Sequence, residues 1–474
     1  MSGSELAAIL RPRVGFLLGK HDDVAPAHLV NGYLAAAFGV PKSWQRIRDL
    51  VTGVDVDPNS YPALTRSGYQ RGAPALRDLQ SDLDVVVNPD RRGWQTVAAS
   101  FAPVHLRFVT RDPSDDANGA YLWAATSAEL RPSTLKALRG LLEPAAATDP
   151  LTLFAMTLTD GVVEPGQPVP PRSTTGWFAP RPRKAIATLR QEMASVIEAL
   201  ANTDGRGRIE AVQHLIRGIY FVWYLGLLLA PLAAVTARRV SQVSDIHEFL
   251  VFADVPPGRP DDPLVVGSSR SLQETSQELH EAYRAEAERA LETVTVPDRL
   301  PGSRQEFRIR VLLGEAGLQG ATLDKAVNAV PRATAGNTVS SYAGALVAQS
   351  HSPEAVSHSL RTVGRMIGLA GPARGFGAPR FLLETPMLST LVRITVPEPS
   401  IPFADFVDRL RTRFGMIVGI GNDDETPKRL SLWDSTDATR DLLIRNEDAL
   451  RSRLISAGLA YQYSDLNTEV FGSA

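Results

Sequence analysis

The sequence predicts a helix-rich, multidomain protein of the α+β class, and three observations lead to that prediction. The chain has 474 residues, which is more than one hydrophobic core usually holds, so about three domains are expected. Many segments place apolar residues at three- and four-residue intervals, and short β-branched or aromatic runs bounded by glycine and proline lie between them. The prolines of residues 165–182 mark a boundary between two such regions.

Four segments follow from these boundaries. They are an N-terminal mixed α/β domain (1–160), a proline-rich linker (161–183), a helical middle domain (184–300), and a C-terminal α+β domain with a winged-helix element (301–474). The helices expected from apolar spacing and capping residues are 25–38, 133–142, 184–202, 209–237, 271–293, 305–313, 322–330, 353–366, 403–414 and 447–457. The expected strands are 83–87, 104–109, 119–125, 249–253, 264–266, 380–383, 416–420 and 459–463.

Composition excludes several functional classes. The formal net charge of −2 gives no general attraction to polyanions, so any nucleic-acid contact must come from a local patch. Cysteine is absent, which excludes disulfides, thiolate nucleophiles and cysteine-based metal centres. The histidines show no metal-ligand spacing, and we expect no cofactor. The N-terminus lacks the features of a secretory signal, so a cytoplasmic location is expected.

Residues 218–237 form an uncharged segment of the length that spans a bilayer. Arginine flanks both ends, which gives no inside–outside asymmetry, and Pro231 interrupts the segment. The sequence therefore predicts a helix buried in protein, and the alternative is a membrane-tethered adaptor.

One short stretch resembles the nucleotidyltransferase pattern, in which a Gly-Ser turn precedes two metal-binding carboxylates on a strand. Residues 67–73 (SGYQRGA) are followed by Asp82 and Asp84, which would share one face of a strand. Gly68 stands where that family has its phosphate-binding serine, and no third carboxylate follows on a later strand. The resemblance implies a diverged enzyme that uses Asp82 and Asp84; the alternative is a pair of solvated aspartates at the start of a strand.

The strongest candidate for a binding site lies between residues 331 and 383. This window holds five arginines and one acid, Glu354. A helix that begins after Ser352 is followed by a Gly/Pro-rich excursion and an arginine-led strand, as in a winged helix. The predicted nucleic-acid-binding residues are Arg361 and Arg365 on the helix, Arg374 at the wing tip, and Arg380. The alternative is a protein-docking module, and the basic linker stretch 165–191 is a second candidate.

Taken together, these features favour a non-catalytic subunit of a bacterial multi-protein system, either DNA-associated or scaffolding, in anti-phage defence or DNA processing. The expected partners are DNA and other protein subunits, and a membrane is not expected. No catalytic residues are predicted, apart from the two aspartates of the alternative enzyme.

Overall fold

The computed structural model describes residues 24–40, 105–109, 118–144, 183–201, 207–235, 248–253, 261–298, 304–315, 319–329, 338–348, 351–372, 378–422, 436–464 and 467–472. These residues form a helix-rich structure with a few small sheets, which agrees with the predicted α+β class. They divide into two compact units, of which unit 2 contains the described residues up to 222 except 183–187, and unit 1 contains the rest. The predicted boundaries at 160, 183 and 300 stay predictions.

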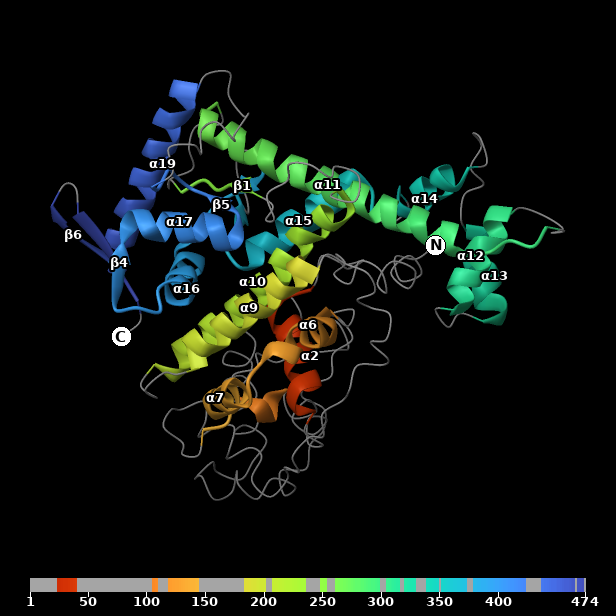
Figure 1. Cartoon of the computed structure of the whole chain (residues 1–474), viewed down its shortest axis with the longest axis horizontal. Coiled ribbons are helices and arrows are strands. Elements are labelled where there is room, and N and C mark those ends of the chain that lie inside the picture. The colour runs from red at the N-terminus through yellow and green to blue at the C-terminus, as the bar shows by residue number, and fades with distance from the viewer. Residues whose placement is uncertain are drawn as a thin grey trace, which may run out of the picture. The chain divides into compact units, whose positions relative to one another are not determined.

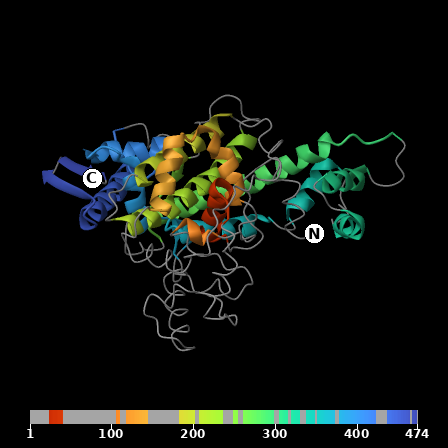
Figure 2. The same cartoon turned by 90° about the horizontal axis from the view of Figure 1, so that it is seen from below.

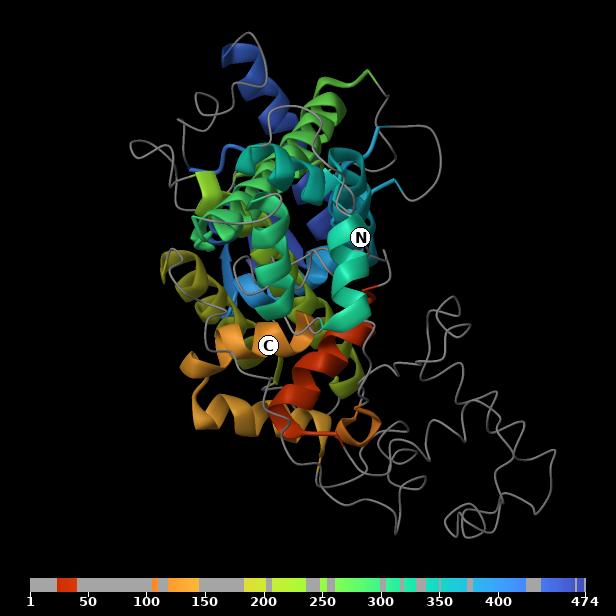
Figure 3. The same cartoon turned by 90° about the vertical axis from the view of Figure 1, so that its right-hand side faces the viewer.

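Every described element of unit 2 is helical. The elements are α2 (Pro26–Phe38), η2 (Leu106–Phe108), α6 (Asn118–Thr126), η4 (Ser127–Glu129), α7 (Pro132–Leu142), α9 (Arg183–Ala201) from residue 188, and α10 (Arg208–Val235) up to residue 222. The red α2 and the orange α6 lie side by side (Figure 3). A Cβ atom at Gly119 would overlap the backbone of α2, so a glycine is needed for this close approach.

Two arginines hold the carboxyl ends of short helices in unit 2. Arg190 Nε donates to the carbonyl of Ala125 at 2.9 Å, and Arg208 Nη1 donates to the carbonyl of Leu141 at 3.1 Å. Such contacts satisfy carbonyls that have no partner within their own helix. The helices α9 and α10 therefore hold α6 and α7 through polar contacts.

Unit 1 is arranged along one long helix, α11 (Pro263–Thr293). The other elements are β1 (Phe249–Leu250), α12 (Arg304–Glu315), α13 (Gly320–Ala329), α14 (Val339–Ala348), α15 (Pro353–Met366), β2 (Ala370–Gly371), β3 (Arg380–Phe381), α16 (Thr385–Thr395), β4 (Ser400–Pro402), α17 (Phe403–Phe414), β5 (Met416–Ile417), α19 (Thr436–Ser456), β6 (Ala460–Ser464) and β7 (Asn467–Phe471). Figure 1 shows α14, α15 and β1 beside α11. The α11 face that they cover is rich in small residues, among them Gly267, Ser268, Ser271 and Thr275.

Hydroxyl groups of α11 bind the strands directly. Ser268 Oγ donates to the carbonyl of Phe381 at 2.6 Å, and Ser271 Oγ accepts from the amide of Leu250 at 3.0 Å. The strand β1 pairs in parallel with β5, and Phe252, just beyond β1, forms a bridge with Leu382 beside β3. Strands from distant parts of the sequence thus meet on the amino-terminal half of one helix.

The C-terminal sheet has three antiparallel strands in the order β4–β7–β6. It stands at one end of unit 1, where the blue strands project in Figures 1 and 2. The helices α16 and α17 are tied together because Arg409 and Arg413 donate to the carbonyls of Thr395 and Ile394 at the end of α16. Arg409 also binds the Glu398 carboxylate through both of its terminal nitrogens, which lowers the pKa of Glu398.

Several sequence predictions of strands are wrong. Residues 106–108 form a 3-10 helix, residues 118–126 form α6, and residues 264–266 belong to the first turns of α11. Asp262 accepts from the amide of Leu264 and Pro263 occupies the first helical position, so a cap starts α11 there. Predicted strand 83–87 lies outside the described residues, and the described part of 1–160 is helical.

Among the described residues, one helix is long and apolar enough to cross a membrane. It is α10, and 83% of the most apolar 18-residue window within Arg208–Leu228 is buried inside the protein. Tyr220 Oη donates to the carbonyl of Val24 at 2.6 Å, so a polar group of this helix has a protein partner within unit 2. Such burial is also the property of a core helix in a large protein. The cytoplasmic location stays a prediction.

Asn446 on α19 joins the strand ends of unit 1, and we predict that it is needed for stability. Its amide donates to the carbonyls of Val251 at 2.8 Å and Val418 at 2.7 Å, and its oxygen accepts from the Ala253 amide at 2.8 Å. Asn446→Ala leaves these buried groups without partners, so it should cost about 3 kcal/mol in the free energy of unfolding. Urea denaturation measures this change.

The matched control is Ser452→Ala, an exposed change on the same helix. It should alter the free energy of unfolding by less than about 0.5 kcal/mol. A loss of stability in Asn446→Ala no larger than in this control would contradict the structural role of Asn446.

Candidate functional site

The helix α15 presents polar side chains on one face and apolar side chains on another. Glu354, His358, Arg361 and Arg365 follow each other at three- and four-residue intervals, which places them along one side of the helix. Val356, Leu360 and Val363 are buried on the side toward the core. We call the former set of four residues the α15 face. It contains two of the four predicted nucleic-acid-binding residues.

Both arginines of the α15 face are partly exposed. Arg361 Nη2 lies 3.1 Å from His358 Nδ1. Because a guanidinium can only donate, Nδ1 is the acceptor in this contact. Glu354 lies at the amino-terminal end, where hydrogen bonds from its own backbone amide and from Ser352 lower the pKa of its carboxyl. The positive charge is therefore at the carboxyl-terminal half of the face.

A short hairpin follows α15 directly. Gly368 ends the helix with φ of +77°, and the amide of Leu369 donates to the carbonyl of Gly364. The strands β2 and β3 then pair antiparallel, with Ala370 opposite Phe381. Arg374, the predicted wing-tip residue, lies between these strands and outside the described residues.

Arg380 is in a different environment from the arginines of the α15 face. Its side chain is 2% exposed, and its guanidinium lies 5.1 Å from the centre of the Phe252 ring. Burial lowers the pKa of this guanidinium, and the negative charge of Asp262 opposes that shift. In this conformation Arg380 supports the packing of β3, and its guanidinium is not at the surface.

Most arginines of α17 and α19 are engaged within the protein. Besides Arg409 and Arg413, Arg445 binds the Asp262 carboxylate and Arg453 donates to the carbonyl of Ala253. Arg451 lies over the ring of Phe403 and near Glu447 and Asp448. These contacts leave the C-terminal elements without a concentration of available positive charge.

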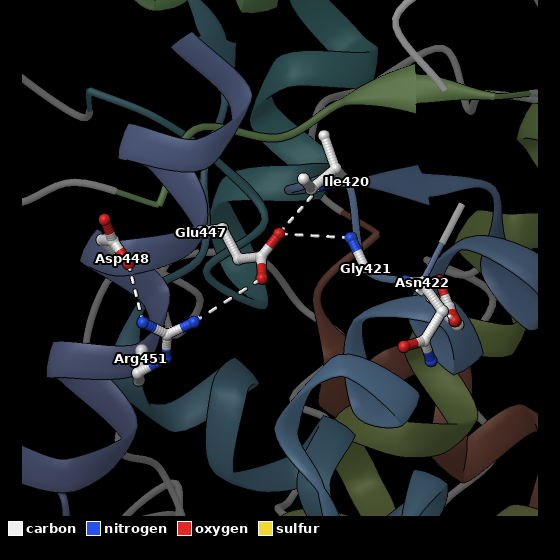
Figure 4. Close-up of polar contacts among 7 residues, drawn as sticks. Ile420, Gly421, Asn422, Glu447, Asp448 and Arg451 are labelled. Atoms are coloured by element: carbon white, nitrogen blue, oxygen red, sulfur yellow. Dashed lines mark hydrogen bonds and ion pairs between the residues drawn. The ribbon is translucent and has the colours of Figure 1, made fainter. Parts of the chain in front are cut away.

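The loop after β5 is held by carboxylates, a feature that the sequence analysis missed. Glu447 Oε2 accepts hydrogen bonds from the backbone amides of Ile420 at 2.9 Å and Gly421 at 3.2 Å (Figure 4). A Cβ at Gly419 would overlap this carboxylate, so the loop needs glycine there. Burial raises the pKa of Glu447, and this effect exceeds the lowering by the two amides and Arg451.

Asp408 on α17 binds the next amide of the same loop. The amide of Asn422 lies 3.2 Å from both Asp408 oxygens, and the Asn422 side chain donates to Asp405 Oδ1 at 2.9 Å. Three consecutive loop amides are thus bound by carboxylates of this chain. Such a run of amides is also what binds phosphates in other proteins, but here the chain itself supplies the anions. The two glycines of residues 418–422 (VGIGN) were the sequence signal that could have indicated this loop.

The outward side of the C-terminal sheet is a second feature that the sequence analysis missed. Tyr461 and Tyr463 on β6 are 57% and 59% exposed, and their ring centres lie 4.9 Å apart in an edge-on arrangement. Glu469 on β7 pairs directly with Tyr461. Aromatic residues two positions apart in a predicted strand were the signal that could have found this surface.

The remaining sequence candidates fall outside the description. Asp82, Asp84 and the basic linker residues up to 182 lie beyond the described residues, so the nucleotidyltransferase resemblance stays a prediction. Within the described ranges, no group of three His, Cys, Asp or Glu side chains is placed to hold a metal ion.

Comparisons with known proteins add no family. The chain matches no protein-family model, no curated protein and no solved structure.

We predict that the negative charge of Glu447 lowers the stability of the fold, whereas its carboxyl oxygen stabilises the fold by accepting hydrogen bonds from the amides of Ile420 and Gly421. The folded protein holds the Glu447 proton more tightly than the unfolded chain does, so stability should fall as pH rises above about 4.3, the ordinary glutamate pKa. Glu447→Gln keeps an acceptor oxygen and removes the charge. The difference in free energy of unfolding between this variant and the natural protein should therefore shift in favour of the variant as pH rises from about 4 to 7.

Glu447→Ala serves as the comparison. It leaves the amides of Ile420 and Gly421 without an acceptor and should cost about 1–3 kcal/mol at pH 7. Denaturation of the three proteins across the pH range measures both effects. A Gln variant as unstable as the Ala variant at neutral pH would show that the charged form is favourable.

Proposed function

We propose that this chain is a non-catalytic subunit of a bacterial multi-protein system and that it associates with DNA through the α15 face and the adjoining hairpin. The observation that carries the proposal is the placement of Arg361 and Arg365 on one partly exposed side of a helix that a hairpin follows at once. A helix and a hairpin in this order are the contact elements of a winged helix, the helix for the groove and the hairpin for the backbone.

The local geometry supports phosphate contact more than base reading. Two guanidinium groups one helical turn apart suit neighbouring phosphates. Glu354 limits the positive charge of the amino-terminal half of α15. Arg374 would extend the patch from the hairpin, whereas Arg380 is left out because its guanidinium is buried. We therefore expect binding that depends weakly on sequence and strongly on salt.

A second element supports the subunit role. From α16 onward the order of elements is α16, β4, α17, β5, α19, β6 and β7. Of these strands β5 pairs with β1, and the other three form the sheet β4–β7–β6. That succession, with the last strand in the middle of the sheet, agrees with a winged helix at residues 385–471, further along the chain than the predicted element. Most arginines of α17 and α19 are bound internally, so this second element favours protein docking over DNA.

The DNA proposal makes a quantitative prediction. The double variant Arg361→Ala, Arg365→Ala should weaken binding to a fluorescent duplex of mixed sequence at low salt. Because each lost phosphate contact removes about 0.9 units of the slope of log affinity against log salt, the slope should flatten by about two units. Fluorescence anisotropy at several salt concentrations measures both quantities.

The control is the double variant Arg289→Ala, Arg310→Ala, which removes two exposed arginines from α11 and α12. It should leave affinity and slope nearly unchanged, and both variants should keep the melting behaviour of the natural protein. If the protein without substitutions does not change the anisotropy of the duplex at about 50 mM salt, the DNA proposal is contradicted.

A further inference from the structure

The outward side of the C-terminal sheet combines exposed aromatic rings with a carboxylate. Pairing places Tyr461 opposite Glu469, and Glu469 opposite Pro402, in one row across the three strands. Directly opposite residues share a face of the sheet. The neighbouring row of Ala460, Val470 and Ile401 is buried, so it faces the helices. We call Tyr461, Tyr463, Glu469 and Pro402 the tyrosine face.

Solvent exposure distinguishes the two tyrosines from other apolar side chains. Among the described residues only two further large apolar side chains are exposed, Val266 and Ile444, and both are less exposed than the tyrosines. Single exposed apolar residues are ordinary, but two adjacent rings on one projecting strand form a patch. Tyrosine is also a residue type that binding surfaces use in excess.

The charge of the tyrosine face is negative. The strands β4, β6 and β7 contain no lysine or arginine, and Glu469 is their one acidic residue. Ser400 Oγ donates to Glu469 Oε2 at 2.8 Å, which holds the carboxylate within the row. A carboxylate beside two ring faces repels phosphates and attracts cations, and a guanidinium can bind such a carboxylate and lie over a tyrosine ring at the same time.

We infer that the tyrosine face docks a partner protein that inserts an arginine side chain between Glu469 and the two tyrosine rings. The partner segment lies on the face of the sheet. The free edge of β6 is less suited to strand addition because the register shifts between Gln462 and Ser464, and such an irregularity protects an edge from pairing. This inference goes beyond the DNA-associated role and does not depend on it, since the residues involved are different.

The experiment uses the full chain labelled with 3-fluorotyrosine and observed by fluorine NMR. The resonances of Tyr461 and Tyr463 are assigned from Tyr461→Phe and Tyr463→Phe. The probe is a hexa-arginine peptide, and the matched control is hexa-glutamate. We expect hexa-arginine to shift these two of the ten tyrosine resonances, and hexa-glutamate to shift neither.

Variants of the face separate its components. Glu469→Gln should weaken the titration about two- to fivefold, as expected for an exposed ion pair. Tyr463→Ser should weaken it by about the same factor through loss of a cation–π contact. Glu398→Gln, which removes an exposed carboxylate on the turn before β4, should leave the titration unchanged apart from a small effect of net charge. All three changes lie at the surface, and thermal melting confirms the fold.

Two outcomes would overturn the inference. The first is that the two resonances do not move with hexa-arginine, or that Glu469→Gln has no more effect than Glu398→Gln. The second is that they move with a ten-residue thymidine oligonucleotide and not with the peptide, which would assign the face to base stacking. Neither outcome affects the duplex-binding test of Arg361 and Arg365, so failure of one proposal is distinguishable from failure of the other.

Discussion

The arrangement of unit 1 depends on the close approach of strands and helices to one side of α11. Over its first turns this side offers Gly267, Ser268 and Ser271, so a strand backbone can come within hydrogen-bonding distance of the helix. Toward the other end, where α14 packs, the buried residues combine alanines with larger side chains such as Leu279 and Tyr283. The direction of the α15 face is set by this packing, because Val356, Leu360 and Val363 bury the opposite side. A bulky residue at Ser268 would therefore disturb β3 first and the candidate DNA surface second.

Local signals predicted several helices, but α6, α14 and α16 were not predicted and the starts of α11 and α19 were placed too late. The helices α15 and α17 begin and end at the predicted residues because their signals are short-range: Ser352 accepts from the amide of Ala355, and Gly415 ends α17 with φ of +72°. Short apolar runs were misread. Residues 119–125 became a helix because Gly119 lets α6 lie against α2, a contact with a distant segment that the run itself does not reveal. The uncharged α14 was missed for a similar reason, since no pattern of charge marks its exposed side.

The candidate site was predicted in part. Sequence placed Arg361 and Arg365 on one helix face, and the structure gives them that position. It could not distinguish Arg380, whose burial arises from Phe252 and the neighbouring α11, more than a hundred residues earlier in the chain. The carboxylate-bound loop and the tyrosine face depend on pairings between α19 and the loop after β5, and between β6 and β7. Such contacts follow from tertiary structure, and single residues give little sign of them.

The continuous helix α10 has a consequence for the synthesis of the chain. Its residues up to 222 belong to unit 2 and the rest to unit 1, yet the helix has no break at that point. Every described residue of unit 2 leaves the ribosome before Trp223, so the first half of α10 can join the core of unit 2 before the elements that follow α10 have emerged. The apolar residues that follow then emerge before α15, whose Leu360 carbonyl accepts from Tyr224, exists to pack against them. For that interval these apolar side chains are exposed on the nascent chain, which is the condition under which growing chains associate with one another.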